Sequence, residues 1–137
     1  MGVDGSPSSM AALDWAATQA ELTGSTLVAV TTWEWPSFGV LLPLPEGYHP
    51  ATDARTVLDD ALGTVRQAHP GVEVRTVVAE GHPAPLLVET AGRADLLVVG
   101  SRGHGEFPGM LLGSVSEHCV THARCPVVVV HERLLGG

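Results

Sequence analysis

Apolar and polar residues alternate along the chain with two different periods. In some segments apolar residues recur every three or four positions, which is the spacing of one face of a helix. Between these segments lie short apolar runs rich in valine, leucine and threonine, which are typical of strands buried in a parallel sheet. The first predicted helix starts at Ser8 or Ser9 and ends near Gly24, and the other predicted helices cover 51–68, 83–93 and 114–122. The predicted strands cover 26–32, 72–78, 94–99 and 127–131.

Strand and helix follow one another regularly, which predicts an α/β fold with a mainly parallel sheet and right-handed crossovers. Helices are therefore expected on both faces of the sheet, in a three-layer, open architecture. The length of 137 residues is close to the commonest size of one domain, so we expect a single domain over residues 1–137. Segment 72–78 at first alternates apolar and polar residues, as strands near a sheet edge do.

Segment 33–50 interrupts the alternation. It contains four prolines and two glycines, so we expect an irregular loop and the most mobile part of the chain. Trp33 and Trp35 flank Glu34 at its start, where they either cover a ligand or partner or pack beneath the loop.

A glycine-rich stretch from Gly100 to Ser114 directly follows the apolar run 96–99. It therefore lies at the carboxyl end of a predicted strand, where open α/β sheets bind their ligands. Glycines allow main-chain N–H groups to approach an anion. A helix that begins near Ser114 directs its unpaired N–H groups and positive dipole end to the same place. These features favour phosphate as the ligand.

Two common phosphate-binding motifs are excluded. All seven basic residues of the chain are arginine, so a P-loop with its lysine is absent. The dinucleotide fingerprint Gly-x-Gly-x-x-Gly fails because Pro108 stands where the third glycine would follow Gly103-His104-Gly105. Phosphate would be held mainly by backbone N–H groups and small hydroxyls, with Arg102 as the nearby positive charge.

The spacing Gly100-x2-Gly103-x9-Gly113-Ser114 resembles the nucleotide-binding signature of the ATP-binding branch of the universal stress protein family. Three further segments resemble landmarks of that family in the same order. The resemblance implies a Rossmann-like sheet of five strands, of the adenine nucleotide alpha hydrolase-like type. The three segments are the opening turn Val3-Asp4-Gly5-Ser6, the turn Gly81-His82-Pro83 before the third helix, and the terminal strand that begins at Cys125-Pro126.

Carried over residue by residue, the resemblance implies a binding site for ATP. Asp4 corresponds to the family residue beside the adenine, and Thr32 to a position near the base and ribose. Residues 100–103 would surround the ribose and the first phosphates, and residues 113–116 the later ones. The expected nucleotide-binding residues are Gly2, Val3, Asp4, Gly5, Thr32, Val99, Gly100, Ser101, Arg102, Gly103, Gly113, Ser114, Val115 and Ser116.

Each part of this site also has a simpler interpretation. Asp4 lies in a sequence that forms ordinary turns, and Thr32 is buried by any strand that ends there. The glycine-rich stretch is then a surface loop that leads into a helix capped by Ser114.

The formal net charge of −8 argues against nucleic acid as a partner, because such a protein needs a clustered basic surface. An anionic nucleotide therefore needs a locally favourable site, and Mg²⁺ bridging its phosphates would help. Mg²⁺ accompanies ATP in members of the resembled family. No apolar stretch reaches the length of a membrane span and the N-terminus lacks an export signal, so we expect a cytoplasmic protein without membrane contact.

We expect neither a fast catalytic centre nor a resident metal ion. No order of serine, histidine and aspartate can be placed in one pocket, and the segment 100–103 lacks the spacing of a nucleophile elbow. His118 and His122 have the i, i+4 spacing of metal ligands, but no third ligand is evident. Cys119 and Cys125 are expected to be structural thiols.

We therefore expect a stress-response or signalling protein whose ATP occupancy alters its conformation or its binding to a partner. The main alternative is a dimeric interaction module that does not need nucleotide, and a third is a slow nucleotide hydrolase. The apolar strand Val127 to Val130 is the expected homodimer interface. An exposed edge strand pairs readily with another chain, and members of the resembled family commonly dimerise there.

One departure from the family pattern concerns the first strand. Members of the family have several apolar residues before the Val-Asp-Gly-Ser turn, whereas only Met1, Gly2 and Val3 precede Asp4 here. We therefore expect the central strand to be truncated or absent in this chain. Either the true start lies upstream, or the fold tolerates a short strand, or a neighbouring chain fills the gap.

We predict that a chain extended upstream by apolar residues is more stable to heat than the 137-residue chain. A central strand forms hydrogen bonds along both edges and is buried on both faces. Thermal unfolding of the two proteins measures the difference, and equal midpoints would contradict the prediction.

Overall fold

The structure is a computed structural model that describes residues 1–35, 46–47, 49–103 and 111–132. Most of the expected irregular loop, residues 104–110 of the glycine-rich stretch and the last five residues lie outside this part of the chain. The elements are, in order, α1 (Pro7–Thr23), β1 (Leu27–Trp33), α2 (Pro50–Ala68), β2 (Val74–Glu80), α3 (Pro83–Thr90), the 3₁₀ helix η2 (Ala91–Arg93), β3 (Leu97–Gly100), α4 (Ser114–His122) and β4 (Val127–Val130).

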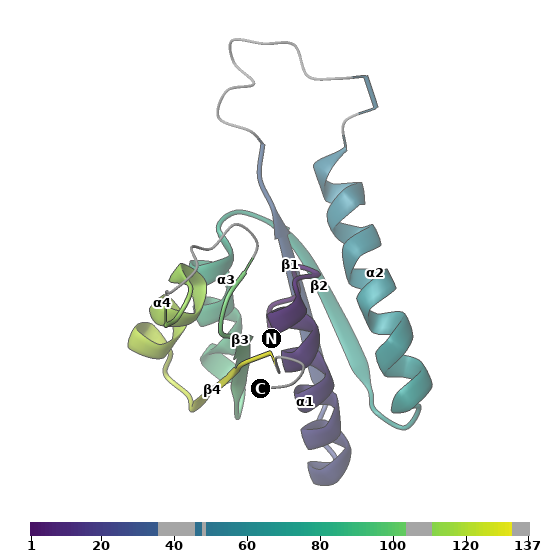
Figure 1. Cartoon of the computed structure of the whole chain (residues 1–137), viewed down its shortest axis with the longest axis vertical. Coiled ribbons are helices and arrows are strands. Elements are labelled where there is room, and N and C mark those ends of the chain that lie inside the picture. Colours follow the sequence, from purple (N-terminus) through teal and green to yellow (C-terminus); the bar gives the residue numbers. More distant parts are fainter. Residues whose placement is uncertain (36–45, 48, 104–110, 133–137) are drawn as a thin grey trace.

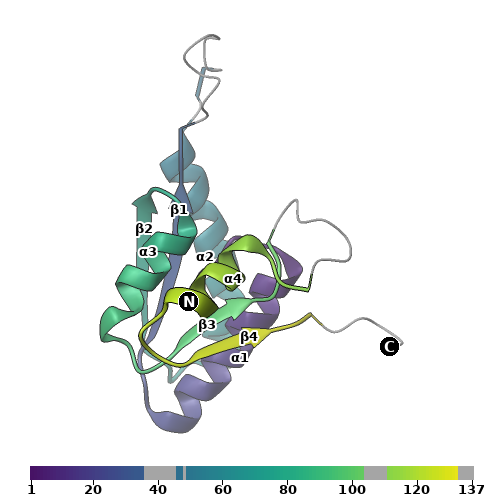
Figure 2. The same ribbon diagram turned by 90° about the vertical axis from the view of Figure 1, so that its left-hand side faces the viewer.

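The strands form two parallel pairs, and helices cover both faces of them. β1 pairs with β2, and β3 pairs with β4. Helices α1 and α2 lie on one side of the strands, and α3 and α4 lie on the other (Figures 1 and 2). The predicted α/β class, parallel pairing and three-layer arrangement are therefore confirmed. Each of the four strands pairs with one other described strand, and β2 lies at an edge of its pair, as its alternating pattern predicted.

Residues 1–3 continue the sheet beside β1, but only as a single bridge. Gly2 bridges Val30 in the parallel direction. The Val3 N–H donates to the Val30 carbonyl over 2.8 Å, and the Val30 N–H donates to the Met1 carbonyl over 2.8 Å. Three residues are too few for a strand, so the described part of the chain has four strands in place of the expected five. In the given chain the segment before Asp4 therefore adds a bridge and no further strand.

Helix α1 begins earlier than its sequence suggested. Ser6, and neither Ser8 nor Ser9, is the N-cap, and its hydroxyl accepts from the Ser9 N–H at 3.3 Å. Proline is favoured at the first helical position, which fixes the start of the helix at Pro7. At the other end Gly24 adopts a left-handed conformation with φ 68°, as expected for a glycine C-cap.

The core has two parts, one for each helix layer. Leu13 of α1 packs with Leu58 and Leu62 of α2 beneath the strands, and all three are fully buried. On the other face Leu87 packs with Cys119 and β3. Both cysteines of the chain are free, and burial raises the pKa of the Cys119 thiol. Within the described residues no helix is both long and apolar enough to cross a membrane.

A histidine joins α1 to the end of α2. His69 follows the last residue of α2, and its Nδ1 lies 2.6 Å from Glu21 Oε2 while its Nε2 lies 3.7 Å from Asp14 Oδ1. The hydrogen bond to Glu21 is the main cause that raises the pKa of His69 above its ordinary value of 6.5. The imidazolium also lies at the negative end of the α2 dipole.

We expect the substitution His69→Gln to destabilise the protein at about pH 5.5 and to have little effect at about pH 8.5. A histidine whose pKa is higher in the folded than in the unfolded state stabilises the fold fully below the unfolded pKa. This contribution disappears as the pH rises through the folded pKa. Urea denaturation at both pH values measures the difference. In a Glu21→Gln background the loss at low pH should shrink, and an equal loss at both pH values would refute the assignment.

Candidate functional site

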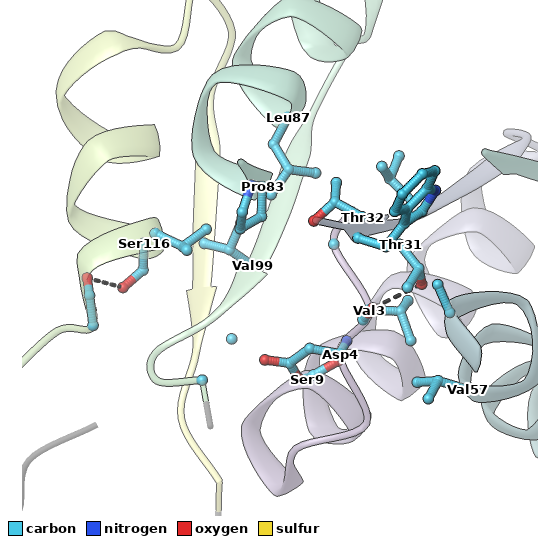
Figure 3. Close-up of a pocket in the computed structure, with 18 of the residues that line it drawn as sticks. Val3, Asp4, Ser9, Thr31, Thr32, Val57, Pro83, Leu87, Val99 and Ser116 are labelled. Atoms are coloured by element: carbon cyan, nitrogen blue, oxygen red, sulfur yellow. Dashed lines mark hydrogen bonds between the residues drawn. The ribbon is translucent and has the colours of Figure 1, made fainter. Parts of the chain in front are cut away.

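A cavity of about 410 Å³ opens at the carboxyl ends of β1 and β3. Its walls come from the segment at residues 2–4, the end of β1, the first turns of α2 and α3, the end of β3 and the start of α4 (Figure 3). Two parallel strand pairs meet here, and the carboxyl ends of parallel strands are where such sheets bind ligands.

The short N-terminal segment forms one wall. The Thr31 hydroxyl donates to the Val3 carbonyl over 2.7 Å, which fixes the segment to β1 (Figure 3). Asp4 Oδ1 accepts from the Ser6 N–H at 2.9 Å, and the Asp4 N–H donates to Ser9 Oγ over 3.1 Å. The turn interpretation of Asp4 is thus correct as a description of its backbone contacts. It is compatible with a ligand role, because Asp4 also lines the cavity.

The end of β3 packs directly on the start of α1. A Cβ placed on Gly100 would lie 2.7 Å from the Ser8 carbonyl carbon and 2.9 Å from its oxygen, so only glycine fits without a backbone shift. Beside it, a Cβ on Gly103 would lie 3.0 Å from Asp4 Oδ2. The glycine-rich stretch and the Asp4 turn, which are far apart in sequence, therefore lie close together at the cavity.

Ser101 holds the two described ends of the glycine-rich stretch together. Its carbonyl accepts from the Gly113 N–H at 2.7 Å and from the Ser116 hydroxyl at 3.1 Å. Its own N–H donates to the Val130 carbonyl of β4 over 2.9 Å. The start of α4 is thereby fixed against the end of β3.

Helix α4 directs its amino end to this place. Gly113 is the N-cap and has no side chain with which to cap the helix, and Ser114 is the first helical residue. The expectation that Ser114 caps the helix is therefore wrong. The first N–H groups of a helix have no intrahelical acceptor, and here no N-cap side chain satisfies them. Gly113, Val115 and Ser116 line the cavity, so this end of α4 offers donors to an anion.

The opposite end of the cavity is more apolar. Pro50, Ala54 and Val57 lie three and four residues apart on the face of α2 that reaches the cavity. Trp33 completes this wall, and its ring packs edge-on against Trp35 with centroids 5.7 Å apart. This end has the flat, apolar surfaces that suit an aromatic base better than a phosphate.

The charges around the cavity are mainly negative. Among the described lining residues, Asp4, Glu34 and Asp53 carry carboxylates and Arg102 carries a guanidinium. Glu34 Oε1 lies 2.6 Å from His82 Nδ1, which keeps this carboxylate at the rim. A highly charged anion therefore needs compensation from backbone N–H groups or from a cation.

The structure brings most of the predicted nucleotide-binding residues together. Gly5, Ser101 and Ser114 do not line the cavity: Gly5 forms the turn before α1 with φ 80°, and Ser101 is buried behind the wall. The predicted residues that do line it are Gly2, Val3, Asp4, Thr32, Val99, Gly100, Arg102, Gly103, Gly113, Val115 and Ser116.

The α2 wall and its neighbours carry no motif in the sequence that marks them as ligand-binding residues. The spacing of Pro50, Ala54 and Val57 indicates an apolar helix face, but the pattern does not say that this face reaches a ligand cavity. Trp33 and Glu34 were recognised only as residues at the mouth. The other lining residues without a predicted role are Ser9, Val30, Thr31, Asp53, Pro83 and Leu87.

The rings of His118 and His122 pack against each other. Their rings lie 4.4 Å apart between centroids with a tilt of 44°. Within the part of the chain that the structure describes, no group of three histidine, cysteine, aspartate or glutamate side chains is arranged to hold a metal ion.

The parallel strands, the helices on both faces and the cavity at the strand ends define a Rossmann-like α/β protein. The profile of the universal stress protein family matches residues 1–131. The chain belongs to this family.

Curated relatives of the chain are longer than the chain itself. The universal stress protein Rv2623 of Mycobacterium tuberculosis is 40% identical over 96% of this chain, and this match covers 46% of the relative. A universal stress protein of Mycolicibacterium smegmatis is 39% identical over 97% of this chain and 45% of the relative. The chain thus spans less than half the length of these relatives.

Solved structures of the same fold include nucleotide complexes. A universal stress protein in complex with cAMP is 30% identical, with a TM-score of 0.73 over 97% of this chain and 94% of that chain. The complex of an Archaeoglobus fulgidus universal stress protein with dAMP has a TM-score of 0.68 over 94% of this chain and 93% of that chain. At 22% identity the second likeness shows the fold alone.

We predict that Gly100→Ala destabilises the protein by about 1–3 kcal/mol, because the added Cβ meets Ser8 backbone that cannot move without shifting α1. Gly92→Ala is the matched control, since a Cβ there has no atom within 4 Å. Urea denaturation measures both losses. Equal stability of the two variants would show that the contact between β3 and α1 yields easily.

Proposed function

We propose that this chain binds an adenine nucleotide in the cavity at the carboxyl ends of β1 and β3. The observation that carries the proposal is the close approach of the Asp4 turn to the glycine-rich stretch at the cavity, where a Cβ added to Gly103 would lie 3.0 Å from Asp4 Oδ2. A segment that suits a base edge therefore lies beside one that suits phosphate. The cAMP complex of a 30% identical protein supports an adenine nucleotide as the ligand class.

The nucleotide would lie with its base toward the apolar wall and its phosphates toward α4. Val3, Asp4 and Thr32 would line the base and ribose end. The phosphate end would be lined by Gly100, Arg102, Gly103, Gly113, Val115 and Ser116. Gly113 would allow the backbone to approach the ligand closely, while the first turn of α4 would supply N–H groups and the positive end of its dipole.

Within this class we propose ATP with Mg²⁺ as the ligand. Three carboxylates in the described lining oppose a triphosphate, and Arg102 offsets one charge. A divalent cation bridging the phosphates removes much of the remaining repulsion. The affinity for ATP should therefore depend on Mg²⁺ more strongly than the affinity for a cyclic monophosphate, which carries a single negative charge.

The proposed role is a stress-response or signalling protein of the cytoplasm whose nucleotide occupancy biases its conformation or its binding to a partner. A homodimer through β4 fits this role, because β4 pairs on one side with β3 and its four valines are half-buried. We do not propose a fast enzyme; ATP hydrolysis, where it occurs, would be slow. Phosphate release well above background from highly purified protein would favour the hydrolase instead.

The second candidate function is a dimeric interaction module that works without nucleotide. The same edge position of β4 favours it, since an edge strand presents unpaired backbone groups to a second chain. Sedimentation with and without ATP and Mg²⁺ distinguishes the two functions. A dimer that forms equally in both conditions, from protein that binds no nucleotide, favours the interaction module.

We predict that protein purified without added ligand releases near-stoichiometric adenine nucleotide on denaturation and that Gly113→Val protein releases none. The valine side chain at the N-cap of α4 would occupy the space in which backbone approaches phosphate. Mass spectrometry identifies and quantifies the nucleotide. Gly71→Val is the matched control, because Gly71 is exposed, remote from the cavity and has no atom within 4 Å of an added Cβ.

Two outcomes would contradict this prediction in different ways. Nucleotide retained by Gly113→Val would refute the phosphate site at the start of α4. No nucleotide in the unmodified protein, together with no thermal shift on adding ATP and Mg²⁺, would refute nucleotide binding itself and favour the interaction module.

A further inference from the structure

Two carboxylates stand at the end of the cavity that suits the base. Glu34 follows the last residue of β1, and Asp53 lies in the first turn of α2. Both line the cavity beside its apolar wall. The start of α4 lies across the cavity from β1, with Ser116 on one side and Thr32 on the other (Figure 3). Glu34 and Asp53 therefore belong to the base end and not to the phosphate end.

Two of the three carboxylates in the described lining have local structural roles. Asp53 lies in the first turn of α2, where a negative charge stabilises the helix dipole. Asp4 Oδ1 accepts from the Ser6 N–H in the turn before α1. Glu34 lies outside the described helices and strands. Its place at the cavity therefore needs a different explanation.

The carboxylate of Glu34 is held by His82. Glu34 Oε1 lies 2.6 Å from His82 Nδ1, and the two side chains are 45% and 78% exposed. A pair with this exposure contributes little to the stability of the fold. It does restrict the rotation of the carboxylate, because Oε1 is bound. Oε2 is then an acceptor with a fixed direction, which lowers the cost of ordering it when a ligand binds.

Backbone contacts fix His82 beside the end of β1. The Gly81 N–H donates to the Trp33 carbonyl over 2.9 Å, which joins the turn before α3 to the last residue of β1. Gly81 has a φ of 136°, a conformation that favours glycine. His82 is the N-cap of α3 and makes no side-chain cap hydrogen bond, so its imidazole is available to Glu34. The next residue, Pro83, lines the cavity, and the pair therefore stands at its rim.

A fixed carboxylate distinguishes between bases by their hydrogen-bonding groups. An ionised carboxylate only accepts hydrogen bonds. Adenine carries an amino group at position 6, which donates, whereas hypoxanthine carries a carbonyl oxygen there, which accepts. Two acceptors that face each other lose hydration and gain no hydrogen bond. A carboxylate that meets position 6 therefore favours adenine over a 6-oxo purine.

We propose that Glu34 determines the base specificity of the cavity by accepting a hydrogen bond from the 6-amino group of adenine, and that His82 positions its carboxylate. This inference rests on the proposed function, because it assigns a specificity-determining residue to the same cavity. Oε2 accepts from the amino group while Oε1 stays in contact with His82. The hydrogen bond is charge-assisted, which makes it stronger than one to a neutral acceptor.

The probes are ATP and ITP, each with Mg²⁺, because they carry the same charge and differ only in the base. Calorimetric titration of nucleotide-free protein should show that ATP binds at least ~10-fold more tightly than ITP. The substitution Glu34→Gln should bring the two affinities to within about threefold of each other, because an amide can accept from an amino group or donate to a carbonyl. The ratio of the affinities is the readout, since the loss of one negative charge affects both nucleotides alike.

Glu80→Gln is the matched control. Glu80 lies opposite Trp33 in the register of β1 and β2 but does not line the cavity, so the same chemical change there should leave the ratio unchanged. His82→Gln should lower the ratio in the unmodified protein. It should have no further effect on the ratio in the Glu34→Gln background, because His82 acts through Glu34.

Equal affinities of ATP and ITP for the unmodified protein would overturn the inference and leave the nucleotide site itself intact. A preference for ATP that survives in Glu34→Gln would also overturn it, because another group would then recognise the base. If Asp53→Asn removes the preference and Glu34→Gln does not, that group is Asp53. If neither nucleotide binds, the proposed function fails, and the base specificity fails with it.

Discussion

The hydrogen bonds between residues 1–3 and β1 are the interaction on which the rest of the molecule depends. They join the backbone of a three-residue segment to Val28 and Val30, and the Thr31 hydroxyl adds a side-chain bond to Val3. The turn at Asp4 and the start of α1 follow directly from this anchored segment. Because α1 in turn packs on the end of β3, the position of the glycine-rich stretch relative to β1 is set by the same few bonds.

An acidic protein can bind an acidic ligand when the favourable groups are backbone dipoles and not side-chain charges. The start of α4 is fixed by two hydrogen bonds to the Ser101 carbonyl, from the Gly113 N–H and the Ser116 hydroxyl. Its N–H groups would therefore need little reorganisation to receive an anion. Such a site costs the protein no buried cation when it is empty. It also explains how a chain with a net charge of −8 and no lysine can belong to a family with nucleotide-bound members.

The sequence predicted the order and type of the elements better than their ends. Helix α4 was predicted over the residues it occupies, because a glycine-serine start and a short apolar pattern leave few alternatives. Helix α1 was shifted, since three serines near its start are all chemically able to cap and Pro7 decides between them. β2 was predicted two residues early, because the alternation of 72–78 is compatible with either boundary.

The glycine-rich part of the candidate site could be predicted because a single motif contains it. The parts of the site that separate elements form were missed. Residues of the glycine-rich stretch are recognisable by spacing, whereas the α2 wall is apolar surface whose use depends on how α2 packs over β1. The division of the strands into two pairs was not predicted, because it depends on how β3 packs on α1.

Gly2 illustrates how a residue can belong to a binding motif for a reason that has nothing to do with the ligand. A Cβ at this position would lie 2.9 Å from Leu87 Cδ1, so the bare backbone of Gly2 leaves room for a core side chain. Leu87 lines both the cavity at the strand ends and a second cavity between β1 and β3, so a larger residue at position 2 would displace a side chain that both cavities share. A mutational scan that scored only ligand affinity would therefore count Gly2 as a contact residue, when its effect is transmitted through the packing of a neighbour.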